Sequence, residues 1–148
     1  MANIRSFKEL RVWQNAMDLA MRVFFITKKF PVEERYSLTD QFRRASRSTA
    51  SNISEAWRKR RYPAAFVSKL NDAEGEAAET QTWTEFSLRC DYITDEDAND
   101  LDRRCEEILG QLVHMISHPG DWCIEIATAP SPRPRVPASP RQSEKGRK

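Results

Sequence analysis

Small and hydrophobic side chains recur in steps of three and four along residues 38–61, the stretch around which the chain is organised. The positions that share this spacing are Leu38, Phe42, Ala45, Thr49, Asn52 and Ala56. Such spacing places them on one face of an α-helix, predicted to run from Leu38 to about Lys59. At about 100° per residue, the opposite face of that helix carries Arg43, Arg44, Arg47 and Arg58. The helix is therefore expected to combine a stripe that packs into a core with a ridge of arginines.

A second stretch with helical spacing covers residues 7–29 and begins with a capping-box pattern at residues 6–9. Its expected buried positions are Leu10, Trp13, Met17, Ala20 or Met21, and Phe24. Pro31 ends this helix, because the residue before a proline avoids the α region. A weaker capping pattern at residues 37–40 precedes the arginine-bearing helix.

Two more helices are predicted after residue 62. The third covers residues 63–90, starts at Pro63 and holds Gly75 in its interior, where we expect a neighbour to approach closely. Thr94 caps the fourth helix, which runs to about Ser117. The buried positions expected in the third are Phe66, Leu70, Ala73, Ala77, Thr80, Trp83 or Thr84, and Leu88. Those expected in the fourth are Ala98, Leu101, Cys105, Ile108, Leu112 and Met115.

Four amphipathic helices with short connections predict an all-α fold, an antiparallel up-down-up-down four-helix bundle over residues 1–118. Residues 119–129 form a short extension, whose Trp122, Ile124 and Ile126 are expected to pack back on the bundle or to add an oligomer contact. Residues 130–148 hold five of the eight prolines and show no apolar periodicity. They predict a disordered, basic C-terminal tail.

Charge is distributed unevenly, although the whole chain has a net charge of only +2. Residues 37–62 carry seven Lys or Arg against two acids, a net +5. Residues 71–107 carry thirteen acids against three arginines, a net −10, and residues 130–148 carry six basic residues against one acid. Such polarity can offer a basic surface to a polyanion, and it can also pair acidic helices with basic surfaces of sister subunits.

Several classes of protein are disfavoured by what the sequence lacks. The three cysteines form no CxxC pair, which fits a reducing compartment, and we expect a cytoplasmic protein without a membrane span. His114 and His118 have a spacing that could hold a metal, but no Glu-x-x-His pair accompanies them. No glycine-rich phosphate loop or nucleophile elbow is present. We therefore expect a protein without a metal or other cofactor that is not an enzyme.

Basic residues of the arginine-bearing helix and its end are the candidate binding site. They are Arg43, Arg44, Arg47, Arg58, Lys59, Arg60 and Arg61. Guanidinium groups match phosphate oxygens, and binding of this kind is largely independent of sequence and sensitive to salt. Two alternatives stay open: ion pairs with acids of the third or fourth helix, within the bundle or between subunits, and a merely solvated face.

Two smaller groups of residues are also candidate sites. Asn52, Glu55 and Glu79 could form a functional site, but a structural hydrogen-bond cluster that fixes helix register is the favoured interpretation. Trp13, Trp57 and Trp83 are expected in the core or at an interface; only if it were exposed could Trp57, beside Arg58, stack on a nucleic-acid base.

Four blocks of sequence carry a resemblance to a known family. They are FKELRVWQNAMDL at residues 7–19, FPVEERYSLTDQFRRAS at 30–46, SNISEAWRKR at 51–60, and Ala73-x-Gly75-x-x-x-Glu79 in a stretch that ends at Tyr92-Ile93. The chain resembles the four-helix-bundle proteins encoded in intervening sequences of bacterial 23S ribosomal RNA genes. It departs from the family pattern at Ala56, where glycine is usual, and at Glu76, where serine is usual.

The resemblance implies a bundle that assembles as a homopentameric ring. It also implies similarity to the accessory protein of diversity-generating retroelements, which works beside a reverse transcriptase and binds nucleic acid. Our hypothesis is a non-enzymatic, oligomeric accessory protein that binds the backbone of RNA or DNA through the basic helix. The alternative is a protein-interaction scaffold that docks a basic partner, such as a reverse transcriptase, through the acidic helices.

Overall fold

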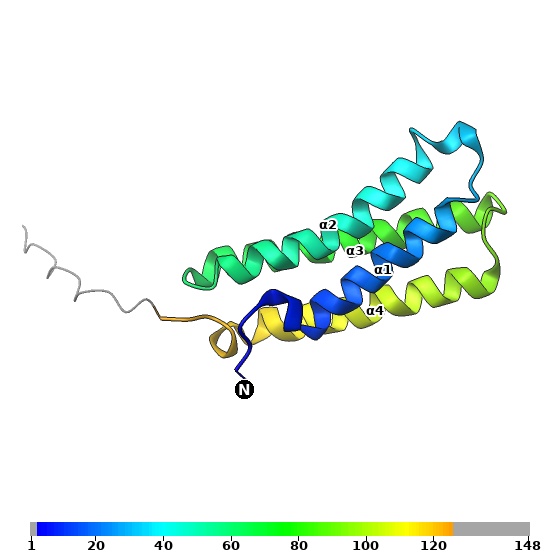
Figure 1. Ribbon diagram of the computed structural model, residues 1–148. Coiled ribbons are helices and arrows are strands. Elements are labelled where there is room, and N and C mark those ends of the chain that lie inside the picture. Colours follow the sequence, from blue (N-terminus) through cyan, green and yellow to red (C-terminus); the bar gives the residue numbers. More distant parts are fainter. Residues whose placement is uncertain (1–2, 126–148) are drawn as a thin grey trace, which may run out of the picture.

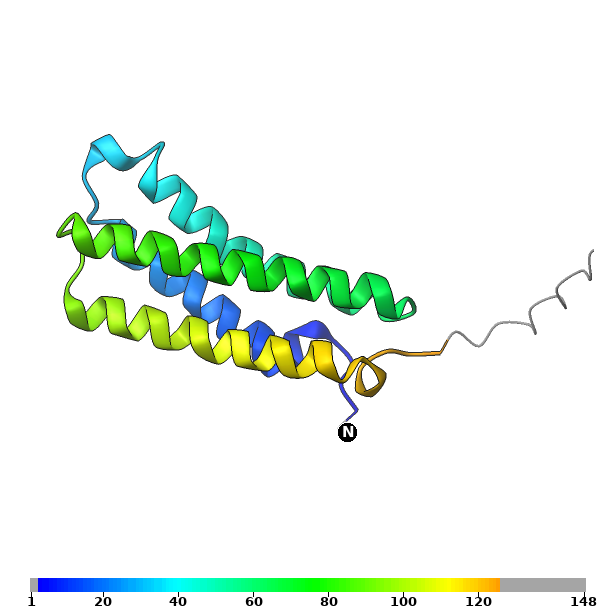
Figure 2. The same ribbon diagram turned by 180° about the vertical axis from the view of Figure 1, so that it is seen from behind.

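A computed structural model describes residues 3–125 and folds them into a bundle of four antiparallel α-helices with three short 3₁₀ turns (Figure 1). The helices are α1 (Arg11–Thr27), α2 (Leu38–Arg58), α3 (Pro63–Arg89) and α4 (Asp95–Ser117). The 3₁₀ turns are η1 (Phe7–Glu9), η2 (Val32–Glu34) and η3 (Pro119–Asp121). Helix α2 packs against α1 and α3, and α4 closes the bundle by contacting α1 and α3 (Figure 2). The predicted all-α, up-down-up-down fold is confirmed.

The stripe predicted for α4 is confirmed at all six positions, from Ala98 to Met115. In α2 the stripe is also buried, except at Asn52, which is half-buried and donates from Nδ2 to the carbonyl oxygen of Ser48 at 2.9 Å. Thr49 is fully buried and satisfies its hydroxyl by donating to the carbonyl oxygen of Ala45 at 3.0 Å. The polar residues of this stripe are thus satisfied within their own helix.

Helix α1 differs from its prediction at both its start and its buried face. The backbone of Leu10 is extended, so the capping box at Ser6 serves η1 alone. Helix α1 begins at Arg11, four residues after the predicted start at residue 7. The side chains that α1 buries are Val12, Ala16, Leu19, Ala20, Val23 and Thr27. Met17 is 37% exposed, so its predicted burial was wrong. Of the alternatives Ala20 and Met21, Ala20 is the one that is buried. The buried face therefore lies one position round the helix from the expected one, with Ala16 in the core in place of Met17.

Local capping was predicted correctly at one helix and wrongly at another. The Thr94 hydroxyl accepts from the Asp97 amide at 3.1 Å and caps α4, and Pro63 opens α3 as expected. Ser37 makes no such cap on α2, because its hydroxyl bonds to the Glu34 carboxylate at 3.0 Å instead. The close approach expected at Gly75 is also absent: an added Cβ would meet nothing within 4 Å.

The short extension after α4 packs back on the bundle, as predicted. Trp122 and Cys123 lie against the core, and the Ile124 amide donates to the carbonyl oxygen of Arg60 at 3.1 Å. This bond ties the extension to the turn between α2 and α3. Ile126 and the predicted tail over residues 130–148 lie outside the described residues.

Candidate nucleic-acid interface

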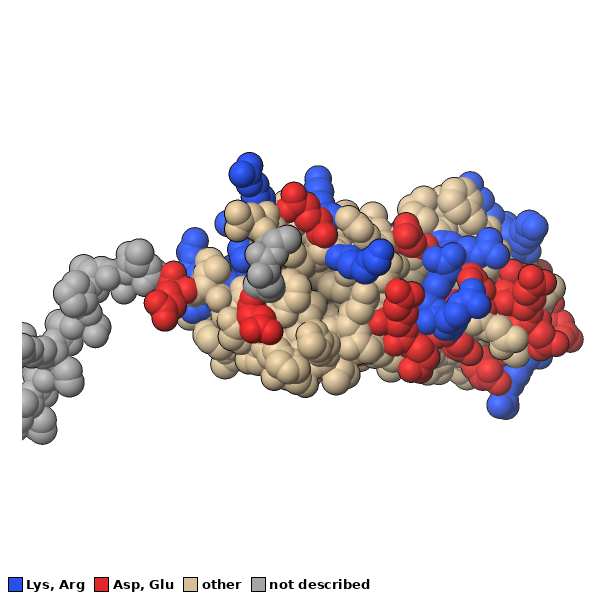
Figure 3. All heavy atoms as spheres, turned by 90° about the horizontal axis from the view of Figure 1, so that it is seen from below, with Lys and Arg blue, Asp and Glu red and all other residues tan. Residues whose placement is uncertain are grey.

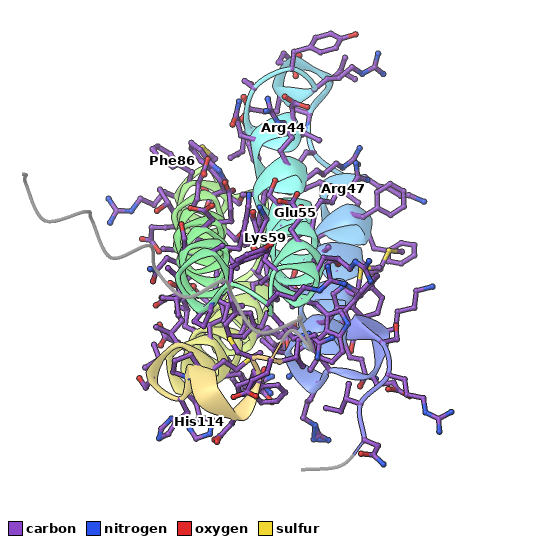
Figure 4. The ribbon with its side chains drawn as sticks, turned by 90° about the vertical axis from the view of Figure 1, so that its left-hand side faces the viewer. Arg44, Arg47, Glu55, Lys59, Phe86 and His114 are labelled. Carbon is purple, nitrogen blue, oxygen red and sulfur yellow. The ribbon has the colours of Figure 1, made fainter. Side chains whose placement is uncertain are left out.

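The basic side chains of α2 form two groups on its outer side. Arg43, Arg44 and Arg47 lie on the first half of the helix, and Arg58, Lys59 and Arg61 lie at its end and in the following turn. Arg47 and Arg58 are eleven residues apart, which is about 16 Å along the axis and about 20° around it. Figure 4 shows Arg44, Arg47 and Lys59 at α2 and His114 on the far side of the bundle. The two groups therefore lie along one surface.

The first group of arginines opens into a pocket of about 510 Å³. We call it the basic pocket. It lies between the end of α1, the connection that contains η2, and the start of α2. Its lining residues are Phe24, Thr27, Lys28, Phe30, Pro31, Val32, Arg35, Thr39, Asp40, Arg43, Arg44 and Arg47. Five of these carry positive charge and only Asp40 carries negative charge.

The ring of Phe24 gathers three of the cations of the basic pocket. The distances to the ring centroid are 4.7 Å from Lys28 Nζ, 5.0 Å from the Arg43 guanidinium and 5.9 Å from the Arg47 guanidinium. The negative face of an aromatic ring attracts cations at these distances. Phe24 therefore holds together charges that would otherwise repel one another.

Arg43 is the most tightly held of the three. Its Nε donates to the Thr27 hydroxyl at 2.8 Å, and that hydroxyl in turn donates to the carbonyl oxygen of Val23 at 2.7 Å. The chain of bonds anchors the inner side of the guanidinium in the bundle. Among the described residues, the two terminal nitrogens of Arg43 form no hydrogen bond with protein, so this pair of donors is available to an anion.

Acids of α3 and α4 form no ion pair with the basic side chains of α2 in the described residues. Within residues 3–125, none of the seven candidate basic residues has a carboxylate within 4.0 Å. Arg44 is near Glu76, whose pKa is raised by burial and lowered in part by that arginine. The acids pair with other cations, as Asp100 does with Arg22, Arg103 and Arg104. The ion pairs weighed for Arg43 and Arg44 within the bundle are therefore not observed.

One acid lies between the two basic groups of α2, and it is paired. Glu55 contacts Lys69 of α3 at 2.8 Å, and this hydrogen bond and charge lower the pKa of the Glu55 carboxyl. Lys69 also contacts Asp72 of its own helix at 3.6 Å, so one cation serves two carboxylates here. A polyanion that lies along α2 would thus meet basic groups at both ends and a partly neutralised acid between them.

Arg60 does not belong to this exposed surface. Its guanidinium lies 3.4 Å from the centroid of the Trp57 ring, and its Nε donates to the Trp57 carbonyl oxygen at 2.8 Å. Burial lowers the pKa of Arg60. Trp57 is only 6% exposed, which confirms its expected place in the core and leaves no exposed Trp57–Arg58 pair to stack on a base. The basic surface of α2 therefore holds six of the seven candidate residues.

The predicted cluster of Asn52, Glu55 and Glu79 does not form. Each has its own partner: Asn52 bonds within α2, Glu55 pairs with Lys69, and Glu79 accepts from Trp83 Nε1 at 3.3 Å. These contacts are local to one helix or join one pair of helices. They do not bring the three polar groups to a common point.

The geometry of the described residues gives little support to a metal site or to a reactive thiol at Cys105. The exposed rings of His114 and His118 stack with centroids 4.6 Å apart, and residues 3–125 contain no group of three potential metal ligands. Cys105 is fully buried, and burial raises its pKa to about 12. No described helix is long and apolar enough to span a membrane.

Three residues of the basic pocket were missed by sequence reasoning. Phe24 was expected to be a core residue, and the candidate binding residues included neither Lys28 nor Arg35. The feature of the sequence that could have revealed them was the short connection between the first and second helices. Since a short connection brings the end of one helix beside the start of the next, Lys28 and Arg35 had to lie near Arg43.

The face over α1 and α4 has a different character. Figure 3 shows acidic and basic side chains intermixed toward the end where α4 begins, and a broad stretch without charge in the middle. Apolar side chains are exposed on α1 at Met17, Met21 and Phe25, which recur every four residues and so share one side of the helix. The exposed side of α1 thus carries an apolar stripe, in contrast to the basic side of α2.

The fold and surface define a small helical bundle that carries one concentrated basic face. A model of the 23S rRNA-intervening sequence protein family matches residues 8–114, and the chain belongs to this family. A crystal structure of a protein of unknown function from the S23 ribosomal protein family, from Bacteroides thetaiotaomicron, is 30% identical. That match covers 71% of this chain and 97% of the other, with a TM-score of 0.65. No curated protein matches the chain.

Proposed function

We propose that the protein is a non-enzymatic binder of nucleic-acid backbone. The observation that carries this proposal is the set of six basic side chains along one side of α2 without an acidic partner in the described residues. Unpaired cations gathered on one surface repel one another, and a polyanion relieves that repulsion. The name of the family, which refers to ribosomal RNA genes, is consistent with such a ligand.

Contacts of this surface are made to phosphate and not to base edges. Arg44, Arg58, Lys59 and Arg61 are exposed and reach outward from a single helix and its following turn. The small polar side chains between the two groups, Ser48 and Ser51, leave room for a strand to lie against the helix. We therefore expect affinity that depends strongly on salt and little on sequence.

We further propose that copies of the chain assemble through the exposed apolar side of α1. Met17, Met21 and Phe25 supply a continuous apolar stripe, and the resemblance implies five copies in a ring. Several basic surfaces in one particle would strengthen binding to a long strand by raising the effective concentration of the next site. Light scattering of Phe25→Ser tests the assembly, and a mass unchanged from the wild type would contradict it.

Charge reversal tests the binding proposal. Arg44→Glu with Arg47→Glu should abolish binding of a labelled single-stranded oligonucleotide in fluorescence anisotropy. The matched control is Arg89→Glu with Arg103→Glu, which changes net charge equally on α3 and α4 at side chains that are 78% and 76% exposed. Circular dichroism and light scattering establish that both variants keep their helices and assembly. Equal loss of binding in the two variants would refute a specific role for α2.

The scaffold alternative, in which acidic helices dock a basic protein such as a reverse transcriptase, has weaker support. The most connected acid, Asp100, already pairs with Arg22, Arg103 and Arg104, so part of the acidic charge is used within the bundle. A pull-down that survives nuclease treatment would favour the scaffold. One that disappears would favour binding through nucleic acid.

A further inference from the structure

The basic pocket holds more positive charge than a passing phosphodiester can balance. Five cations and one carboxylate line it, a net charge of +4. An internal phosphodiester of a strand brings one negative charge with two free oxygens. A phosphate monoester brings about −1.5 to −2 at pH 7 and three acceptor oxygens. The charge of the pocket therefore matches a monoester better than a diester.

The arrangement of donors also suits a compact, doubly charged group. Phe24 draws Lys28, Arg43 and Arg47 together over one ring, and Thr27 orients Arg43 so that its terminal nitrogens remain available. Such preorganised donors surround a single group instead of following a line of phosphates. The exposed basic residues at the other end of α2, around Arg58, do not line a pocket of this kind, which an aromatic ring and the connection between α1 and α2 enclose.

The size and remaining lining of the pocket indicate what is attached to that phosphate. A volume of about 510 Å³ exceeds the space that one phosphate needs and is typical of sites for small organic ligands. Phe30, Pro31 and Val32 supply apolar surface beside the cations. The pocket thus has room for a terminal sugar and base behind the phosphate, with the rest of the strand continuing along α2.

We propose that the basic pocket binds the terminal phosphate monoester of a nucleic-acid strand. This inference rests on the proposed function, because it specifies which part of the nucleic acid the same surface holds. The end of the strand occupies the pocket, and the neighbouring phosphodiesters lie on the exposed basic residues at the other end of α2, around Arg58. The pocket provides a preference for strand ends that the open part of the surface lacks.

Competition by matched ligands tests the proposal on the full-length protein. Oligonucleotides of one sequence are compared with a 5′-phosphate, a 3′-phosphate or hydroxyls at both ends, together with a free nucleoside monophosphate. We expect one of the phosphorylated oligonucleotides to compete about tenfold to a hundredfold better than the hydroxyl-ended one, as one or two further charge-assisted hydrogen bonds would give. Which of them does so identifies the end that is bound.

Variants separate the pocket from the rest of the surface. Lys28→Gln and Phe24→Leu should each reduce the preference for the phosphorylated strand, because one removes a cation and the other removes the ring that gathers three. Lys59→Gln with Arg61→Gln should weaken all oligonucleotides alike and leave the preference unchanged. If Phe24→Leu lowers the helical signal in circular dichroism, Lys28→Gln on the exposed end of α1 still provides the test.

The outcomes distinguish this inference from the function on which it rests. Equal competition by all three oligonucleotides would overturn the pocket proposal while leaving backbone binding intact. A free monophosphate that competes as well as the phosphorylated strand would overturn the assignment to strand ends. Absence of binding by every oligonucleotide at low salt would refute the proposed function itself.

Discussion

Salt dependence should reveal how many of the basic residues of α2 contact phosphate. The structure leaves six of them free for this role, since Arg60 covers Trp57. For single strands the logarithm of affinity falls with the logarithm of salt with a slope of about −0.7 per contact, so six contacts give a slope of about −4. Affinity should then drop by about 300-fold between 50 and 200 mM salt.

Removing two of these charges should change the slope by a defined amount. Arg44→Gln with Arg58→Gln takes one cation from each basic group, and the slope should become about −2.8. Both side chains are exposed and neither has a carboxylate partner in the described residues, so the fold should be unaffected. Fluorescence anisotropy with an unphosphorylated oligonucleotide at four or more salt concentrations measures both slopes.

The control for this experiment is Arg89→Gln with Arg103→Gln, which removes the same charge from α3 and α4. Its slope should equal that of the wild type, because these residues pair with Glu85 and Asp100 away from α2. If the α2 variant keeps the wild-type slope, its arginines do not contact phosphate. A wild-type slope near zero would show that binding is not electrostatic at all.

Three further outcomes follow from single side chains. Gly75→Ala should raise the free energy of unfolding by about 1 kcal/mol in a urea titration, because alanine favours a helix and nothing obstructs its Cβ; an unchanged or lower stability would contradict this. With a thiol reagent at pH 8, exposed Cys90 should react first and Cys105 only on unfolding, because burial raises the Cys105 pKa to about 12 and keeps it protonated; mass spectrometry of the labelled peptides measures the order. Glu55→Gln should tighten oligonucleotide binding several-fold in anisotropy, because it removes a negative charge between the two basic groups and leaves Lys69 with Asp72 as its one remaining carboxylate contact among the described residues; Glu85→Gln serves as the control, and weaker binding would refute the argument.

Sequence reasoning succeeded where spacing alone determines the answer. In α4 the expected stripe recurs in steps of three and four, and Ala98 to Met115 were all placed correctly in the core. In α1 the same spacing fits two neighbouring stripes: Met17 was expected in the core, whereas the structure buries Ala16 and Leu19. The spacing alone does not decide which of two adjacent apolar stripes faces the other helices.

The candidate site could be predicted only as far as it lies on one helix. Arg44 and Arg58 follow from the helical wheel of α2, but the basic pocket depends on where α1 ends and how the connection folds. Ser37 illustrates the difficulty: its hydroxyl had two suitable partners, and it bonds to Glu34 instead of capping α2. Such choices depend on competing contacts that no single stretch of sequence contains.

The bond between Ile124 and the turn at Arg60 holds the segment after α4 at one end of the bundle. Residues Asn3, Ile4 and Ile124 line one small pocket beside Trp57, so both described ends of the chain meet at one end of the bundle. The basic pocket lies at the other end, and α2, whose 21 residues measure about 31 Å, joins the two. A fluorophore at either end of the described chain would therefore sit within energy-transfer distance of a labelled strand without obstructing the pocket. The transfer efficiency from each end of that strand would report its polarity on the protein.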